Sequence, residues 1–293
     1  MSLEVVEREE AAPRPRKLPT VDFHCHISIT EYTDPAHPTV VEVSQEEFKR
    51  DLAEAGIDRA VVLSDARSPP EAVARFCSRD PQVFVGFGYV NPVQRGAEEE
   101  ARRQRLELGL HGLKLYPCSD GYAADDPHAF KVYEVASQLG MPVMFHHAGM
   151  PTSYDLLRHT DPAQIDVVAH SFPELPIVLA HLGYPRVDET LYVARKHRNV
   201  YVDLSWPYGD LHHPSYLYLL WRDLLTALNL GVMNKVLFGT DYPGVRQKAY
   251  LEILWSVNRF SPSRDLDIPL DSLQATLDAN PAPLLPPTPQ GTA

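Results

Sequence analysis

The sequence is poor in cysteine and has no long apolar run. Its three cysteines, Cys25, Cys77 and Cys118, are an odd number and lack the paired spacing of zinc motifs. We therefore expect no disulfide framework, and we predict a cytoplasmic protein because the cytoplasm keeps thiols reduced. No apolar run approaches the ~20 residues that a membrane helix needs. The N-terminus also lacks the apolar core of a secretory signal.

Positive charge is also scarce. Lysine and arginine number 27 against 39 aspartates and glutamates, and the formal net charge is -12. Nucleic acids and anionic membrane surfaces are bound through excess lysine and arginine, so neither is an expected partner. The expected partner is a small-molecule substrate, and a homodimer is the commonest assembly. No G-x-G-x-x-G or Walker-type loop follows the first apolar run, which argues against a nucleotide-binding open sheet.

What the sequence does contain is a regular alternation of two kinds of segment. Short apolar runs rich in β-branched residues are each followed by a longer stretch with helical spacing. Near-continuous apolar runs are typical of parallel strands that are covered on both faces. Eight such runs predict eight strands, at residues 20–27, 59–64, 83–90, 111–117, 142–149, 176–183, 200–205 and 235–243.

The stretches between these runs carry helix signals. Ser44 followed by Glu47 is a capping-box pair, and an apolar stripe that begins at Ala129 ends at Gly140. Alternating strands and helices admit a barrel or a doubly wound sheet, and the missing nucleotide loop favours the barrel. We predict an α/β protein with a single (β/α)8 TIM barrel over residues 19–285. A short N-terminal arm (1–18), a C-terminal helix and a disordered proline-rich tail (286–293) complete this prediction.

Histidines and one aspartate fall at the ends of the predicted strands. His24 and His26 lie two residues apart in the first strand, so their side chains share a face. His146 ends the fifth strand, His181 the sixth and Asp241 the eighth. The carboxyl ends of all strands meet at one face of a barrel, where active sites are built. Imidazole and carboxylate are ligands that a divalent ion such as zinc prefers, so the pattern predicts a metal site.

Several short motifs, in this order and spacing, resemble those of the amidohydrolase superfamily. They are DFHCHI, GLKLYP, PVMFHHAG, VLAHLG and FGTDYP, followed by LDANPAPLL, so the resemblance spans residues 20–285. The branch that the chain resembles includes aminocarboxymuconate semialdehyde decarboxylase, resorcylate decarboxylases and several lactonases. The resemblance implies a metal-dependent enzyme with one or two divalent ions, zinc first, with manganese or iron as alternatives.

The resemblance also implies roles for single residues. His24 and His26 would bind the metal, and His146 and His181 would be further ligands or site histidines. Asp241 would ligate the metal or act as the base, taking a proton from a water whose pKa the metal lowers. His181 would also hold the oxygen on which charge develops.

Neighbours of these residues have open roles. Lys114, in the KLYP segment, resembles the carboxylated lysine that bridges two metals in dihydroorotases; alternatively it pairs with a carboxylate or a substrate anion. His147 is expected to face away from the site if its strand is regular, and a bulge would reverse that assignment. Cys25 is expected to pack beneath the helices, and Cys118 either lines the pocket or is inert.

Residues that follow the strands are candidates for contacting a substrate. Three arginines could each clamp a carboxylate or phosphate, and three aromatic residues could form a wall. These are Arg67, Arg186 and Arg246, and Tyr116, Trp206 and Tyr242. Residues 28–43 form the first loop after a strand and could act as a lid, and His37 within them is expected at the surface.

The sequence leaves four functions open. The first is a metal-dependent hydrolase of a small, carboxylate-bearing lactone, ester or amide, acting through metal-activated water. The second is a non-oxidative decarboxylase of an aromatic or unsaturated acid, whose metal holds the substrate's oxygens. Several decarboxylase relatives follow the fifth-strand histidine with proline, whereas this chain reads HHAG, which favours hydrolysis. A non-haem iron oxygenase and a barrel that only binds its ligand are the remaining alternatives.

Overall fold

The computed structural model describes residues 18–31, 39–149 and 155–287 of the chain. Eight strands form one parallel sheet in the order β1-β4-β5-β6-β7-β8-β9-β10. They are β1 (Val21–Cys25), β4 (Arg59–Leu63), β5 (Phe84–Tyr89), β6 (Gly112–Leu115), β7 (Val143–Phe145), β8 (Ile177–Leu179), β9 (Val200–Asp203) and β10 (Val236–Leu237). Each lies inside one of the predicted ranges, so the eight-strand prediction is confirmed.

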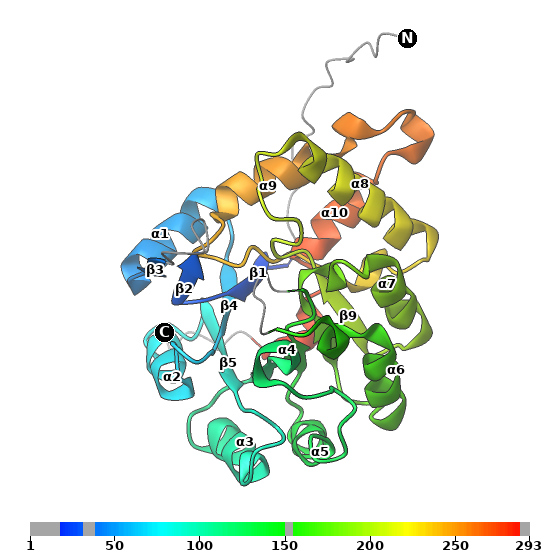
Figure 1. Ribbon diagram of the computed structural model, residues 1–293. Coiled ribbons are helices and arrows are strands. Elements are labelled where there is room, and N and C mark those ends of the chain that lie inside the picture. Colours follow the sequence, from blue (N-terminus) through cyan, green and yellow to red (C-terminus); the bar gives the residue numbers. More distant parts are fainter. Residues whose placement is uncertain (1–17, 32–38, 150–154, 288–293) are drawn as a thin grey trace.

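The first and last strands of this sheet meet and make it a barrel (Figure 1). The backbone N–H of Phe23 donates to the carbonyl of Phe238 at 2.8 Å. Further along, Asp241 N–H donates to His24 at 2.8 Å and His26 N–H donates to Tyr242 at 2.7 Å. A doubly wound sheet would leave both edges open, so the prediction of a TIM barrel is confirmed.

Helices surround the barrel (Figure 1), because each connection between parallel strands must cross over the outer face of the sheet. They are α1 (Gln45–Ala55), α2 (Pro70–Ser78), α3 (Ala97–Leu106), α4 (Pro117–Asp120), α5 (Phe130–Gln138), α6 (Pro162–Ser171), α7 (Val187–Lys196), α8 (Pro214–Asn229), α9 (Gln247–Trp255) and α10 (Leu270–Leu277). Ser44 caps α1 by accepting a hydrogen bond from the backbone N–H of Glu47, as the capping-box pair predicted.

The apolar core has two layers. Inside the barrel, Phe23 packs edge-to-face on Phe87 in a cluster that also contains Met144, Leu237 and Leu284. Between the strands and the helices lies a larger cluster, to which each strand contributes the side chains on its other face. The apolar interior layer fills the middle of the barrel. A polar site must therefore lie at an end of the barrel, and in this fold it lies at the carboxyl ends of the strands.

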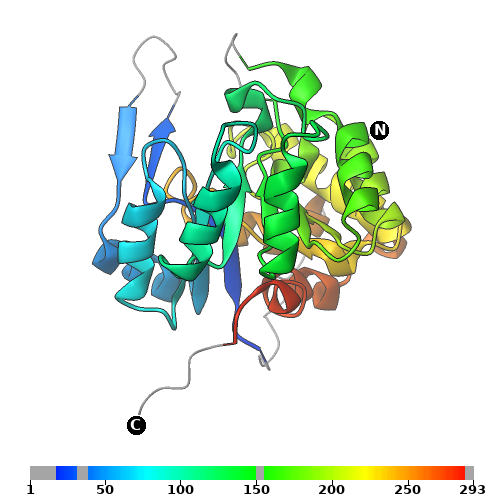
Figure 2. The ribbon, with the colours of Figure 1, turned by 90° about the horizontal axis from the view of Figure 1, so that it is seen from below.

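A hairpin not expected from the sequence follows β1. β2 (Ser28–Glu31) and β3 (Thr39–Glu42) pair antiparallel and stand beside the barrel (Figure 2). The hairpin lies within residues 28–43, the predicted first connection between a strand and a helix, in which no strands were predicted. Residues 32–38, which include His37, lie outside the described residues, as do 1–17 of the predicted arm and 288–293 of the tail. Within the described ranges, no helix combines the length and apolar character needed to cross a membrane.

Candidate metal centre

A bulge in β1 places two histidines at the mouth of the barrel. The register between β1 and β4 shifts between Asp22 and Cys25. Phe23 packs inside the barrel, whereas Cys25 packs in the outer layer, as predicted for this cysteine. An extra residue in a strand re-aims the side chains that follow it. In a regular strand the side chain after the inward Phe23 would point outward. Because of the bulge, His24 also points into the barrel mouth, and His26 points to the same site.

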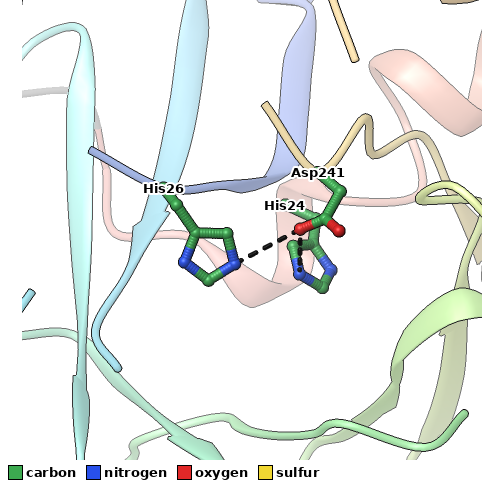
Figure 3. A group of neighbouring side chains, drawn as sticks. All are labelled: His24, His26 and Asp241. Carbon is green, nitrogen blue, oxygen red and sulfur yellow. Dashed lines mark ion pairs between the residues drawn. The ribbon is translucent and has the colours of Figure 1, made fainter. Parts of the chain in front are cut away.

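His24, His26 and Asp241 converge on one point (Figure 3). The carboxylate oxygen Oδ1 of Asp241 lies 3.4 Å from Nε2 of His24 and 3.3 Å from Nε2 of His26. Both histidines are buried, and Asp241 is only slightly exposed. The three residues come from the two strands that close the barrel, so the seam of the barrel fixes their spacing.

The backbone and charge of Asp241 are both unusual. Its φ of 64° lies in the left-handed region, which few residues other than glycine adopt and which is common at functional sites. Burial acts to raise the pKa of its carboxyl, but the hydrogen bond from His26 and the neighbouring imidazoles of His24 and His181 outweigh it. The pKa of Asp241 is therefore well below its ordinary value, and the carboxylate is ionised at neutral pH.

His181 and His146 form a second part of the site. Nδ1 of His181 lies 2.6 Å from the carbonyl oxygen of Ser205, which can only accept, so this nitrogen carries the proton. Nε2 of His181 then accepts from Nδ1 of His146 at 3.1 Å. This leaves Nε2 of His146 with a free lone pair, buried and without a hydrogen-bond partner among the described residues.

Burial holds the pKa of both of these imidazoles below its ordinary value, with nearby positive groups adding to the effect for His146. Neutral imidazole is the form of histidine that binds metal ions.

Lys114 lies on β6 and points to the same centre. It is fully buried, and its Nζ lies 3.3 Å from Nε2 of His24 and 3.5 Å from the sulfur of Met144. Burial lowers the pKa of its amine to about 8, although Asp203 and Asp241 act in the opposite direction. The position suits either predicted role, and carboxylation of Lys114 stays a prediction.

The residues at this centre fit a divalent metal ion. His24, His26 and Asp241 offer two imidazole nitrogens and a carboxylate oxygen that all lie within 4.8 Å of one another. Nδ1 of His26 and Nε2 of His146 are buried without a hydrogen-bond partner among the described residues. Nitrogen and oxygen donors of this kind suit zinc, and they also accept manganese or iron.

A second donor group lies on the other side of His24 and was missed from the sequence. Asp203, at the end of β9, is fully buried, and its Oδ2 lies 2.8 Å from Nδ1 of His24. Ser205 lies beside it, with Oγ 2.9 Å from Nδ1 of His24 and 3.0 Å from Nδ1 of His181. The signal was present, because Asp203 is a carboxylate at the carboxyl end of a predicted strand.

Three of the predicted substrate residues lie near the mouth. The ring of Tyr116 stacks on that of His146, with ring centres 5.8 Å apart. The ring of Trp206, next to Ser205, packs closely on Gly244 in the turn that follows Asp241. Arg67 is exposed, and its nearest carboxylate is Asp65, at 3.8 Å. Oδ2 of Asp65 in turn lies 4.0 Å from Nδ1 of His26.

Tyr242 and Arg246 are not brought to the site, and the substrate-binding roles predicted for them are not supported by their positions. The ring of Tyr242 stacks on Phe48 of α1, with ring centres 4.3 Å apart, and its hydroxyl donates to Asp51 at 2.8 Å. Arg246 pairs with Asp51 and Glu47 on the same helix. The left-handed turn at Asp241 sends the next side chain outward, so the two neighbours face opposite ways.

This position gives a testable consequence. Replacing Tyr242 with Phe removes one hydrogen bond to Asp51 and leaves the apolar stacking in place. We expect the free energy of unfolding to fall by about 1 kcal/mol while kcat/KM stays unchanged. Urea denaturation and steady-state kinetics measure the two effects. A fall in kcat/KM at unchanged stability would contradict this conclusion and would show that Tyr242 contributes to the active site.

Arg186 and His147 lie away from the donor groups. Arg186 pairs with Asp161 at 3.1 Å, at the start of α6. His147 is buried, and neither of its ring nitrogens has a hydrogen-bond partner among the described residues. Burial lowers its pKa to about 3, so the ring is neutral. Neither residue takes part in the network around His24.

Comparison with known proteins identifies the family. The sequence model described as amidohydrolase matches residues 21–286. The chain belongs to the amidohydrolase family. The resemblance inferred from the motifs is thereby confirmed. This amidohydrolase is 26% identical over 196 residues to 2-amino-3-carboxymuconate-6-semialdehyde decarboxylase of Dictyostelium discoideum, a match that covers 58% of this chain and 54% of the relative. It thus spans about half the length of that relative.

Solved structures share the fold of this amidohydrolase. An uncharacterized TIM-barrel protein from Bordetella bronchiseptica has a TM-score of 0.71 and 23% identity, covering 91% of this chain and 98% of that one. The 5-carboxyvanillate decarboxylase of Sphingomonas paucimobilis gives 0.65 and 16%, covering 92% and 99%. A protein named as a probable 2-pyrone-4,6-dicarboxylic acid hydrolase, from Acinetobacter baumannii, gives 0.65 and 17%, covering 90% and 98%.

Proposed function

We propose that this amidohydrolase is a metal-dependent, non-oxidative decarboxylase of an aromatic or unsaturated carboxylic acid. The observation that carries the proposal is the match over 196 residues to a relative that is named as a decarboxylase of such an acid. The donor set of His24, His26 and Asp241 adds support, because it fits the divalent ion that this chemistry uses.

The metal ligands in this proposal are His24, His26 and Asp241, with His146 as a further donor. These residues would hold a divalent ion, which would supply a Lewis acid to orient and polarise the oxygens of the substrate. Zinc is the first expectation, and manganese and iron remain alternatives. Lys114 is buried beside His24, and its amine can stabilise negative charge on the substrate.

The chemical step exchanges a carboxylate for a proton. The bond between the carboxylate and its carbon breaks, CO₂ leaves, and the electron pair stays on the carbon until a proton arrives. Asp241 moves this proton: its carboxylate takes it from an acidic group of the substrate and returns it to the carbon. The ionised carboxylate of Asp241 is the form that can take up this proton.

The walls of the mouth suit a flat, negatively charged substrate. Tyr116, stacked on His146, offers an aromatic surface against which a planar ring or diene can lie. Trp206, which follows Ser205 and packs on Gly244, can add a second aromatic surface. Arg67 is exposed at the rim and can pair with a second carboxylate of the substrate.

Hydrolysis is the second candidate. The HHAG segment favours it, and so does the ionised carboxylate of Asp241, which can accept a proton from water. One structural neighbour is named as a hydrolase of a pyrone dicarboxylic acid. We rank decarboxylation first because the relative with the higher sequence identity is named as a decarboxylase. An iron oxygenase stays an alternative that metal analysis tests.

Product analysis distinguishes these reactions. The purified protein, loaded with zinc or manganese, is incubated with a panel of aromatic acids, unsaturated acids and lactones, and the products are analysed by mass spectrometry. We expect a product that is lighter than the substrate by the mass of CO₂, together with release of CO₂. The metal-free protein and the His24→Ala variant should give no such product and release no CO₂. A product heavier by one water would instead identify a hydrolase, and oxygen uptake an oxygenase.

A further inference from the structure

Two groups of possible metal donors share His24, and they differ in geometry. On one side, Nε2 of His24 faces Asp241 at 3.4 Å in the group completed by His26. On the other side, Nδ1 faces Asp203 at 2.8 Å in a group with His181. The longer spacing leaves room for an ion between the atoms, whereas the shorter one is that of a charge-assisted hydrogen bond.

Asp203 is held by contacts on both of its oxygens. Its Oδ1 accepts from the backbone N–H of His181 at 3.0 Å and from the backbone N–H and hydroxyl of Ser205 at 3.0 and 2.5 Å. Its Oδ2 is the oxygen that faces Nδ1 of His24. A fully buried carboxyl group whose Oδ1 accepts from three donors is fixed in place.

We infer that Asp203, supported by Ser205, is a positioning residue that fixes the tautomer of His24. Oδ2 of Asp203 lies 2.8 Å from Nδ1 of His24 and Nζ of Lys114 lies 3.3 Å from Nε2, so the acceptor oxygen faces Nδ1 and the amine faces Nε2. This arrangement places the ring proton on Nδ1 and keeps the lone pair of Nε2 toward Asp241. The same residue holds the backbone of His181, whose φ of 59° lies in the left-handed region. Asp203 thus prepares two histidines of the centre without binding the metal itself. The inference rests on the proposed use of a metal.

The variant Asp203→Asn isolates this role. Oδ1 of Asp203 accepts from three donors, so the amide oxygen of Asn takes that position and its NH₂ takes the place of Oδ2. The NH₂ then donates to Nδ1 of His24, which moves the ring proton to Nε2, where the metal would bind. The contacts to His181 and Ser205 are retained, so the change acts on His24 and leaves the fold in place.

Two measurements on the full chain test the inference. The first is ¹⁵N NMR of the His24 ring in the metal-free protein, which reports the tautomer. We expect the proton on Nδ1 in the wild type and on Nε2 in Asp203→Asn. The second is the affinity for Zn²⁺ from competition with a chelator. Affinity is expected to fall about 10- to 100-fold in Asp203→Asn. Asp223→Asn is the matched control, a buried carboxylate on α8 that accepts from Tyr208 and Arg222, and should leave zinc affinity unchanged.

The outcomes separate this inference from the proposed function. A proton on Nε2 of wild-type His24 would overturn the inference without any variant, and so would unchanged zinc affinity in Asp203→Asn. Loss of zinc together with an unchanged tautomer would make Asp203 a ligand, which also contradicts it. If the wild type binds no zinc while His24 carries its proton on Nδ1, the metal-dependent function fails and the tautomer assignment stands.

Discussion

Replacing Asp241 with Asn is expected to lower kcat/KM by about 10²- to 10⁴-fold, the range found when a proton-transfer group is lost. Asn matches the carboxylate in shape and still offers an oxygen donor to a metal. It cannot take up a proton in the range where enzymes work. The variant should therefore keep much of its metal, because His24 and His26 remain, while losing turnover.

Steady-state kinetics and metal analysis on the same preparation measure both effects. Asp51→Asn provides a control, since Asp51 is an acidic residue on α1 whose partners are Tyr242, Arg246 and Arg50. It should leave kcat/KM near the wild-type value. Full activity in Asp241→Asn would exclude Asp241 as the group that moves the proton.

Replacing Lys114 with Met is expected to stabilise the metal-free protein at neutral pH by roughly 3 kcal/mol. Met is close to Lys in length, so the apolar surroundings, which include Met144, stay filled. The stabilisation follows from the lowered pKa of Lys114, about 8 in the folded protein against an ordinary value of 10.5. A pKa unit corresponds to 1.36 kcal/mol of difference between the two protonation states, so the shift sets this scale.

The pH dependence has a definite sign. Between about pH 8 and 10.5 the unfolded chain binds a proton at Lys114 that the folded chain does not. The stability of the wild type therefore rises with pH across this range. The advantage of Lys114→Met is full below pH 8 and disappears toward pH 10.5. Urea denaturation in the presence of a chelator, with the exposed Lys131→Met as control, measures it. A constant difference between wild type and variant at all pH values would contradict the assignment.

The histidines of the centre could be predicted because their signal is local and the fold is regular. Strand ends are visible as the ends of apolar runs, and a parallel barrel brings all such ends to one face. This rule, the two-residue spacing of His24 and His26 and the family motifs all indicate His24, His26 and Asp241. The bulge between Asp22 and Cys25 changes the directions of the side chains within it, and His24 and His26 still converge on Asp241.

Other features depend on contacts that no local pattern reveals. Tyr242 follows Asp241 directly, yet its direction is set by a left-handed turn and by stacking on Phe48, far away in the sequence. The β2–β3 hairpin interrupts the strand-helix alternation, so the pattern that predicts the barrel strands does not reveal it. Asp203 obeys the strand-end rule, but its role depends on the proximity of His24, which is 179 positions away.

The most direct test of the account is the metal content of the wild type and of His24→Ala, measured by elemental analysis after expression in medium supplied with zinc and manganese. His24 lies at the strand end and contributes little to the apolar core, so the variant should remain folded by circular dichroism. The account predicts at least one divalent ion per wild-type chain and a clear loss in the variant. A folded wild type without metal, or a His24→Ala variant that keeps the full metal content, would contradict it.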